Sequence, residues 1–434
     1  MTSNEVHDVS PLAGAGLSRG RLAALDAAPV VARSLPTSPM SPAEVRAAGL
    51  ALADLWLPAV TLDRDALLHN LDRFRRWCAE QDADLAPHGK TTMAPVLWAA
   101  QLDRGAWALT AATVAQARVM RDHGADQVII ANEVTDPGQL AWLAESLADP
   151  AFTPYCLVDS EDGVRLLDQA LSGAPRPLPV LVEVGVPGRR AGVRDTGTAL
   201  SLARTVAACP HLVLAGVEGF EGVFPQRRDD DSPQRVSSWL DALVALTRSA
   251  DTEGLFAEAE EIVVTAGGSS FPDLVAEAFA RLDDTSRPVR RVVRSGCYLT
   301  HDDLMMERAS PLRTGADDDP LRPALSCYAR VLSIPEPGRA LLGAGKRDVA
   351  YDIDLPVVRA VLRDGERLPV SGGLRVVELN DHHAFVDLDG SVRLEVGDVV
   401  ELGLSHPCTV FDKWPLIPVL DPDGRVVDAV RTLF

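Results

Sequence analysis

The chain of 434 residues has a deficit of positive charge. It contains 62 Asp and Glu against 42 Lys and Arg, which gives a formal net charge of −20. Nucleic acids and anionic membrane surfaces require a net basic face, so neither is expected as the main partner. A small anionic ligand is not excluded, because it needs only a local binding site.

Cysteine is scarce and unpaired in the sequence. The six cysteines lie far apart without a C-x-x-C pair, which argues against a disulfide framework and against a structural zinc cluster. No apolar run is long enough to span a membrane, and the first ten residues lack the features of a signal peptide. We therefore expect a cytoplasmic protein that binds no membrane.

Lysine is the scarcest charged residue, occurring only as Lys90, Lys346 and Lys413. Arginine supplies the remaining positive charge, but it stays protonated and cannot form a Schiff base. A lysine kept at the end of a predicted strand, as Lys90 is, indicates covalent amine chemistry. A surface lysine is the alternative, and spacing alone does not decide between them.

The length predicts more than one domain, since single hydrophobic cores stop growing at roughly 250–300 residues. Residues 1–55 are expected to form a loosely packed N-terminal extension with one short helix. Residues 56–312 form the first predicted domain, and a Pro- and Asp-rich stretch at 313–323 opens the second, 313–434.

The first domain alternates short apolar runs with helical stretches, a pattern typical of parallel strands joined by crossover helices. The predicted strands are 84–88, 107–111, 127–132, 154–160, 179–186, 212–220, 261–268 and 291–296. Eight such units predict an α/β fold of the (β/α)8 TIM-barrel type. An open doubly wound sheet is the alternative, weakened because no G-x-G-x-x-G follows the first strand. The segment 313–434 reads as strands and turns, which predicts an all-β domain.

Functional residues of such barrels lie where the strands end. The turn Gly267-Gly268-Ser269 precedes a predicted helix, and Gly296 ends the neighbouring strand. Backbone N–H groups at such turns bind anions. Ordinary turn glycines explain either segment alone, but two segments at consecutive strand ends favour a phosphate site.

Several motifs together resemble one family. They are PHGKTTMAP (87–95), AGGSS (266–270), RSGCYLTHDD (294–303), ELNDHHAFV (378–386) and VGDVVELGLSHPCTVFDKW (396–414). Their types and order are similar to the fold-type III, alanine-racemase-like pyridoxal-phosphate enzymes, in the branch of D-serine dehydratase and D-threonine aldolase. The resemblance covers roughly residues 55–434.

This resemblance implies pyridoxal 5'-phosphate as the cofactor. Lys90 corresponds to the lysine that bonds to the cofactor aldehyde and acts as the base at the substrate Cα, with His88 beside it. Arg190 corresponds to an arginine that meets a carboxylate or the cofactor ring. The implied phosphate cup consists of Gly267, Gly268, Ser269, Gly296, Cys297 and Tyr298. Glu218 or Glu221 is a candidate partner of the pyridine nitrogen.

The resemblance also implies a metal site in the β domain, at His406 and Cys408, with His383 nearby as a substrate or supporting residue. Imidazole and thiolate two residues apart on an extended segment point to one side, and both favour zinc over magnesium or calcium. A buried cysteine beside a structural histidine is the alternative. The aldolase branch typically carries a carboxylate as the second ligand, so Cys408 favours the dehydratase. Asp302 and Asp303 are interpreted as capping or surface acids.

The implied function is conversion of a β-hydroxy D-amino acid, such as D-serine or D-threonine, into a 2-oxo acid and ammonia with zinc assistance. Alternatives are an aldolase, a racemase, for which no tyrosine is securely placed as second base, and a non-catalytic pyridoxal-phosphate-binding protein. The last are single barrels, unlike this chain. The resemblance further implies a homodimer, with each site between one barrel and the partner's β domain.

Overall fold

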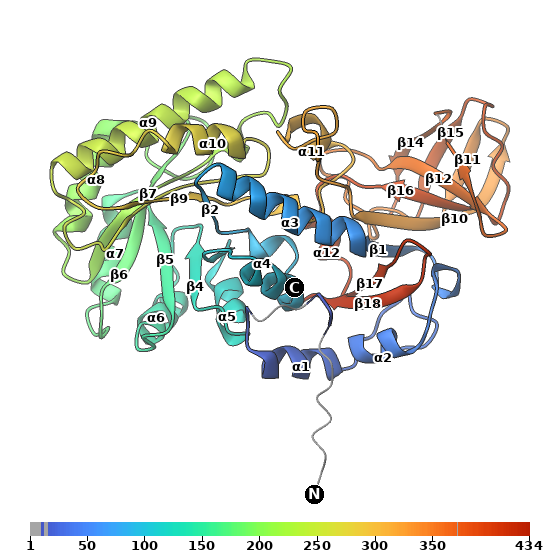
Figure 1. Cartoon of the computed structure of the whole chain (residues 1–434), viewed down its shortest axis with the longest axis horizontal. Coiled ribbons are helices and arrows are strands. Elements are labelled where there is room, and N and C mark those ends of the chain that lie inside the picture. Colours follow the sequence, from blue (N-terminus) through green and yellow to red (C-terminus); the bar gives the residue numbers. More distant parts are fainter. Residues whose placement is uncertain (1–9, 13–15, 371) are drawn as a thin grey trace, which may run out of the picture.

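The computed structural model describes residues 10–12, 16–370 and 372–434. The chain forms two units joined side by side, a parallel sheet surrounded by helices and an antiparallel sheet (Figure 1). The parallel strands are β2 (Asp84–Leu85), β3 (Leu109–Ala111), β4 (Gln127–Ile130), β5 (Thr153–Val158), β6 (Leu178–Val184), β7 (Leu212–Phe220), β8 (Ile262–Gly267) and β9 (Val289–Val293). Each falls on one of the eight strands predicted from the sequence.

The parallel sheet closes into a barrel. Its order is β2-β9-β8-β7-β6-β5-β4-β3. The two outer strands meet through backbone hydrogen bonds, from Trp107 N–H to Leu85 O at 2.7 Å and from Thr110 N–H to Pro87 O at 2.9 Å. The predicted TIM-type barrel is therefore confirmed, and the open doubly wound sheet is not found.

Helices follow the barrel strands as crossovers on the outside of the sheet. These crossovers are α4 (Pro95–Asp103), α5 (Val114–Asp122), α6 (Pro137–Ser146), α7 (Glu161–Ala170), α8 (Thr196–Ala207), α9 (Ser232–Thr252) and α10 (Pro272–Phe279), while α3 (Arg64–Glu80) precedes β2. In α3, Leu67, Leu71 and Phe74 recur at helical spacing and are buried. The Asp63 carboxylate accepts from Ala66 N–H at 2.7 Å and caps this helix.

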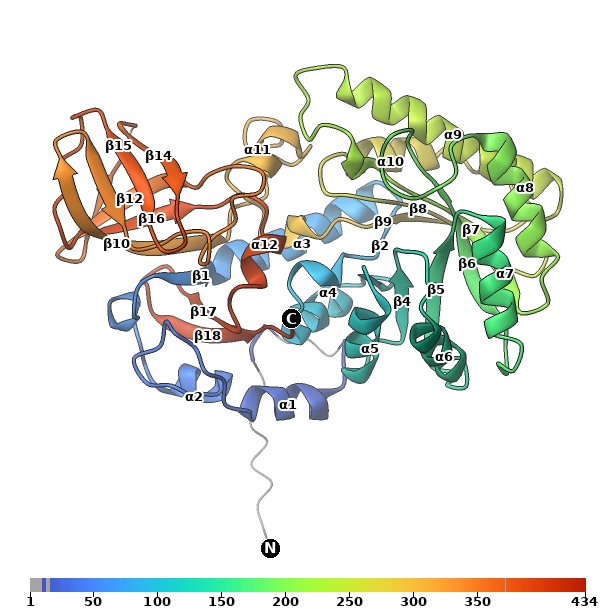
Figure 2. The same ribbon diagram turned by 180° about the vertical axis from the view of Figure 1, so that it is seen from behind.

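The antiparallel sheet lies at the other end of the molecule. It contains β1 (Ala59–Asp63), β10 (Leu325–Glu336), β11 (Arg339–Leu342), β12 (Val357–Arg363), β13 (Glu366–Pro369), β14 (Leu374–Leu379), β15 (Ala384–Leu388), β16 (Val399–Gly403), β17 (Leu416–Leu420) and β18 (Val426–Arg431). Among the described residues after 323, the only α-helix is the four-residue α12 (Cys408–Phe411), which lies near the barrel (Figure 2). The all-β prediction is confirmed.

Strand β1 corrects one predicted boundary. Residues 56–312 are predicted to form the barrel domain, yet β1 pairs antiparallel with β10 and parallel with β17. A short apolar run reads alike in a barrel strand and in an antiparallel strand, so periodicity does not assign it to a sheet.

The N-terminal extension is packed rather than loose. It contains α1 (Arg19–Ala27), α2 (Pro42–Ala47) and a short 3-10 turn, Leu52–Asp54. Leu35, Val45 and Leu55 form one buried apolar cluster with Tyr328 and Leu416 of the antiparallel sheet. The prediction of loose packing is wrong, because these apolar residues cover that sheet. No described helix has the length and apolar character needed to cross a membrane.

Candidate active site

A cavity of about 330 Å³ opens at the carboxyl ends of the barrel strands, facing the antiparallel unit. Its volume suits a small ligand or cofactor. Most of the predicted site residues line it: His88, Lys90, Arg190, Gly268, Ser269, Gly296, Cys297, His406 and Cys408. The two units therefore contribute to one space, with His406 and Cys408 supplied by the C-terminal segment.

An anion cradle occupies the side of the cavity next to β8 and β9. The N–H groups of Gly296 and Cys297 both donate to Ser269 Oγ, at 3.2 and 3.1 Å. Two backbone donors thus converge on one point. Gly268 has φ +135°, a conformation that favours glycine, and a Cβ at Gly296 would come within 2.6 Å of Thr91 Oγ1. Glycine at these positions lets the backbone approach a ligand closely.

Lys90 reaches the same cavity from the turn that follows β2. It lies in the 3-10 turn Gly89–Thr91 and makes no hydrogen bond or ion pair with any described residue. A side chain of α4 fixes this turn, because Trp98 Nε1–H donates to Gly89 O at 2.9 Å. A Cβ at Gly89 would come within 2.6 Å of Met120 Cε and 3.0 Å of Trp98 Nε1, so a larger residue there would have to displace the end of the Met120 side chain. An unpaired amine therefore faces an anion cradle across one cavity.

Comparison with known proteins identifies two domains that correspond to the two units of the fold. Residues 62–259 match the family described as "Alanine racemase, N-terminal domain", and residues 324–420 match the "Putative serine dehydratase domain". The two matches occur in this order and correspond to the barrel and the antiparallel unit. The chain belongs to the fold-type III, alanine-racemase-like family.

Two curated members of the family are similar over most of their length. The chain is 27% identical to a D-threonine aldolase of Arthrobacter sp over 381 residues, 87% of this chain and 92% of that protein. It is 24% identical to the D-threo-3-hydroxyaspartate dehydratase of Delftia sp. (strain HT23) over 389 residues, 86% of this chain and 97% of that protein. A D-threonine aldolase structure from Filomicrobium marinum superposes with a TM-score of 0.73 at 24% identity, covering 88% of this chain and 97% of that one, which shows the shared fold.

Pyridoxal phosphate, the cofactor of this family, fits the residues present. The cradle at Ser269, Gly296 and Cys297 suits a phosphate, and the free amine of Lys90 suits an aldehyde. Small and apolar side chains, Ala112, Ala131 and Leu157, line the barrel side of the same cavity.

Buried acids and one arginine lie on the barrel side. Arg294, which is 1% exposed, donates to Glu218, to Gly219 O at 3.0 Å and to Thr265 Oγ1 at 3.2 Å. Burial, with the charge of Glu218 beside it, raises the pKa of Glu183 to about 10. Burial also raises the pKa of Glu218. Of the two candidate partners for the pyridine nitrogen, Glu218 lines the cavity.

Glu221 lies elsewhere, directly behind Gly268 of the cradle loop, where a Cβ on that glycine would collide with the carboxyl group. It is 1% exposed, and Oε2 has no hydrogen-bond partner among the described residues. Burial raises the pKa of Glu221 to about 8.

His88 is neutral beside Lys90. Burial, together with the positive charges of Arg294 and Lys90, holds the pKa of His88 well below its ordinary value. Neither ring nitrogen has a partner among the described residues. His88 is therefore available to exchange a hydrogen bond with a ligand in the cavity.

His406 and Cys408 form the donor pair on the opposite wall. His406 Nδ1 pairs with Asp352 Oδ2 at 2.5 Å. The His406 side chain also interacts with Cys408, and these two partners raise the pKa of His406 to about 9. The pKa of the Cys408 thiol lies well below its ordinary value, because Cys297 is its hydrogen-bond partner and His406 lies beside it. An imidazole and a thiolate are donors that suit zinc. Among the residues that the structure describes, no group of three or more His, Cys, Asp or Glu side chains forms a metal site, so this pair would supply two protein ligands.

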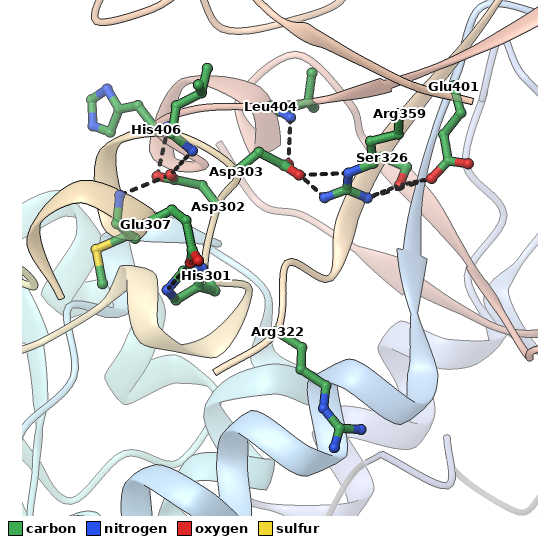
Figure 3. A network of polar contacts seen from close by, with 12 residues as sticks. His301, Asp302, Asp303, Glu307, Arg322, Ser326, Arg359, Glu401, Leu404 and His406 are labelled. Carbon is green, nitrogen blue, oxygen red and sulfur yellow. Dashed lines mark hydrogen bonds and ion pairs between the residues drawn. The ribbon is translucent and has the colours of Figure 1, made fainter. Parts of the chain in front are cut away.

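The backbone at His406 is strained, with φ +50°, and a polar network holds it (Figure 3). His406 N–H donates to Asp302 Oδ2 at 3.2 Å, while Asp302 Oδ1 accepts from the N–H groups of Leu304 and Met306, both at 2.9 Å. Asp302 is 4% exposed. Asp302 is therefore a capping acid, as predicted, because it accepts from the N–H groups of Leu304 and Met306. The alternative prediction of a surface position is wrong for Asp302, because the residue is buried.

Asp303 adds further contacts between the loop after β9 and the segment that precedes His406. Its carboxylate binds Arg359 through two hydrogen bonds, at 2.6 and 2.5 Å, and accepts from Leu404 N–H at 3.0 Å (Figure 3). Asp303 N–H donates to Leu404 O at 3.0 Å. The loop that follows the anion cradle is therefore tied to the segment that leads into His406.

Three predicted residues lie outside the cavity. Tyr298 is buried behind the cradle, stacked on Phe74 with ring centroids 4.2 Å apart, and its hydroxyl accepts from Gln101 Nε2 at 3.0 Å. Gly267 faces Arg294, where a Cβ would lie 2.9 Å from Nε. His383 is exposed in the turn between β14 and β15. Their assigned roles stay predictions.

Several residues that line the cavity were not predicted from the sequence. Glu183 carried a detectable signal, because it is the one charged residue in the apolar strand β6. Arg294 carried none, since it follows β9, which already contains Arg290 and Arg291. Met305 and Ile353 also line the cavity, and Asp352 binds His406. These three carried no signal, since only the fold brings their loops to the barrel.

Proposed function

We propose that this chain is a pyridoxal-phosphate-dependent lyase that converts a β-hydroxy D-amino acid, such as D-serine or D-threonine, into a 2-oxo acid and ammonia with zinc. The observation that carries the proposal is one cavity in which Lys90, the anion cradle and the pair His406 and Cys408 face one another. Related family members named as enzymes of β-hydroxy D-amino acids support it.

Lys90 performs the proton transfer in this proposal. The bound cofactor supplies an electron sink for the electron pair left at Cα. The Lys90 amine takes the Cα proton, and the cradle residues keep the phosphate fixed while it does so. Neutral His88 lies beside Lys90 and is placed to exchange a hydrogen bond with the substrate.

A zinc ion held by His406 and Cys408 would supply Lewis acidity at the β-hydroxyl. In the dehydration, the Cα–H and Cβ–O bonds break, water leaves, and hydrolysis of the resulting enamine yields one 2-oxo acid and one ammonia. The Asp352 partner of His406 supports this role, because such carboxylates orient ligating histidines.

Cys408 favours dehydration over aldol cleavage. Structures of the D-threo-3-hydroxyaspartate dehydratase include a histidine-to-alanine variant and a cysteine-to-alanine variant, and the second is named as metal-free. This chain carries a histidine and a cysteine in the corresponding type of segment, His-Pro-Cys.

Aldol cleavage is the second candidate, favoured by the 27% identity to a D-threonine aldolase. In that reaction the β-hydroxyl loses its proton, the Cα–Cβ bond breaks, and glycine and an aldehyde form. The same cofactor and metal residues would serve.

Metal removal tests the zinc role. The cofactor-loaded protein is assayed with D-serine and D-threonine before chelation, after chelation and after addition of Zn²⁺. We expect activity to fall at least about tenfold on chelation and to return with zinc. Full activity in metal-stripped protein would contradict the assignment of His406 and Cys408.

A further inference from the structure

The wall of the cavity next to the proposed metal pair is apolar. Met305 and Ile353 line it. Met305 is 6% exposed and packs in one cluster with Cys297 and Met306, against which Cys408 also packs.

Both side chains are held beside the metal pair by the contacts of their neighbours. Asp302 accepts from the N–H of Met306 and from the N–H of His406, which places the start of α11 (Met305–Ala309) next to His406. Asp352, which precedes Ile353, binds both His406 Nδ1 and Thr409 Oγ1, the latter at 2.9 Å. If the β-hydroxyl of a substrate faces His406 and Cys408, a substituent on its Cβ would therefore lie near Met305 and Ile353.

No lysine or arginine among the described residues lies on this wall beside Met305 and Ile353. The lysine and arginine side chains among the described cavity residues are Lys90, Arg190 and Arg294. Arg294 is bonded to Glu218 on the barrel side, and Arg190 lies after β6 over the Phe220 ring, 5.0 Å from its centroid. Arg190 is thus available for one substrate carboxylate.

The nearest arginine of α11 is already paired. Arg308 binds Asp354 at 2.8 Å and does not line the cavity. A second carboxylate on the substrate would lie against two apolar side chains near Asp352, with no lysine or arginine among the described cavity residues at that point to pair with it. Met305 is 6% exposed and Ile353 is 44% exposed, so a carboxylate between them would lose part of its hydration and gain no ion pair from either side chain.

We infer that the site selects β-hydroxy D-amino acids whose β-substituent is uncharged, such as hydrogen, methyl or a larger apolar group, and that Met305 and Ile353 determine this specificity. The inference rests on the proposed function and adds the substrate class. The inferred substrate preference differs from that of the relatives that are named as enzymes of 3-hydroxyaspartate.

A matched substrate panel tests the inference. The zinc- and cofactor-loaded protein is assayed with D-threonine, D-3-phenylserine and both diastereomers of D-3-hydroxyaspartate. We expect kcat/KM for the uncharged substrates to exceed that for 3-hydroxyaspartate at least about tenfold. The variant I353R should raise the ratio of 3-hydroxyaspartate to threonine kcat/KM about tenfold, because it adds the missing cation.

The control is V396R, which changes an apolar residue that is 64% exposed and lies outside the cavity. It should leave the ratio unchanged, as should the apolar replacement M305L. A preference of the unmodified protein for 3-hydroxyaspartate would overturn the inference and leave the proposed lyase function intact. An unchanged ratio in I353R would also overturn it.

Absence of turnover with every substrate would overturn the proposed function instead. In that case the inference is tested by the binding of two amino acids to the cofactor-loaded protein. Binding of D-2-aminobutyrate and of D-aspartate is measured as the change in cofactor absorbance during titration. Tighter binding of D-2-aminobutyrate supports the apolar wall, and tighter binding of D-aspartate overturns it.

Discussion

Lys90 stands out in the sequence because lysine is rare, and it lies in the candidate active site. It is one of three lysines in 434 residues, and its amine is unpaired among the described residues in a cavity that also holds an anion cradle. Of the other two, Lys413 donates to Thr409 O and Lys346 lies over the Tyr351 ring.

Borohydride reduction of the loaded protein should therefore fix the cofactor to Lys90. We expect the mass increment on the peptide that contains this residue, and a loss of kcat of at least about a thousandfold in K90A. The control is K346A, an exposed lysine outside the cavity. A cofactor mass on Lys346 or Lys413 would contradict the assignment.

Glu221 predicts a dependence of stability on pH. Its pKa is about 8 in the folded protein and near the ordinary value of 4.5 when unfolded. Between these values the folded chain keeps the proton while the unfolded chain loses it, so the free energy of unfolding falls as pH rises from about 4.5 to about 8. Below that window, the group contributes no pH dependence.

The variant E221Q removes this titration. Relative to the unmodified protein, its free energy of unfolding should gain about 1.4 kcal/mol or more between pH 5 and pH 8, the value of one pKa unit. Denaturant unfolding at both pH values, with the same cofactor loading, measures it, and E366Q serves as an exposed control. Parallel pH profiles for E221Q and the unmodified protein would show that Glu221 is not a buried acid.

At the level of elements, the loop after β9 connects two functional segments. It begins with the cradle residues Gly296 and Cys297 and continues to Asp302, which binds the N–H of His406. Asp303 and Arg359 add a second connection. The position of the proposed metal pair relative to the phosphate cradle therefore depends on this loop.

Replacing Asp302 tests that connection. D302A removes the acceptor that holds the strained backbone of His406, and we expect zinc affinity to fall about 10- to 100-fold, as for other residues that support metal ligands. Competition with a chromogenic chelator measures this loss independently of activity. E366A is the control, and unchanged zinc affinity in D302A would contradict the positioning role.

Sequence patterns predicted the eight barrel strands because alternation of apolar runs and helices repeats along the chain. They misassigned β1, since five residues with an apolar core carry no information about their pairing partner. They also missed Met305, Ile353 and Asp352, because contacts between distant loops depend on the closed fold rather than on local periodicity. Lys90 was found from the scarcity of lysine and its place at the end of a predicted strand, whereas His406 and Cys408 were found because the resemblance identified them.

At the scale of the whole molecule, neither unit forms the cavity alone. The barrel supplies the lysine and the cradle, and the antiparallel unit supplies His406 and Cys408. The net charge of −20 does not oppose an anionic cofactor, since backbone N–H groups and a hydroxyl form the cradle.

The homodimer implied by the family resemblance stays a prediction. Light scattering of the cofactor-loaded protein should give about twice the chain mass of 46.4 kDa. A mass of one chain at micromolar concentration, with full activity, would show that the site needs no partner subunit.

The central claim is that this cavity removes ammonia from a β-hydroxy D-amino acid. The most direct measurement follows D-threonine by proton NMR in the presence of the zinc- and cofactor-loaded protein, with ammonia determined in parallel. The account predicts 2-oxobutanoate and ammonia in equal amounts. Glycine and acetaldehyde in equal amounts, without ammonia, would contradict it.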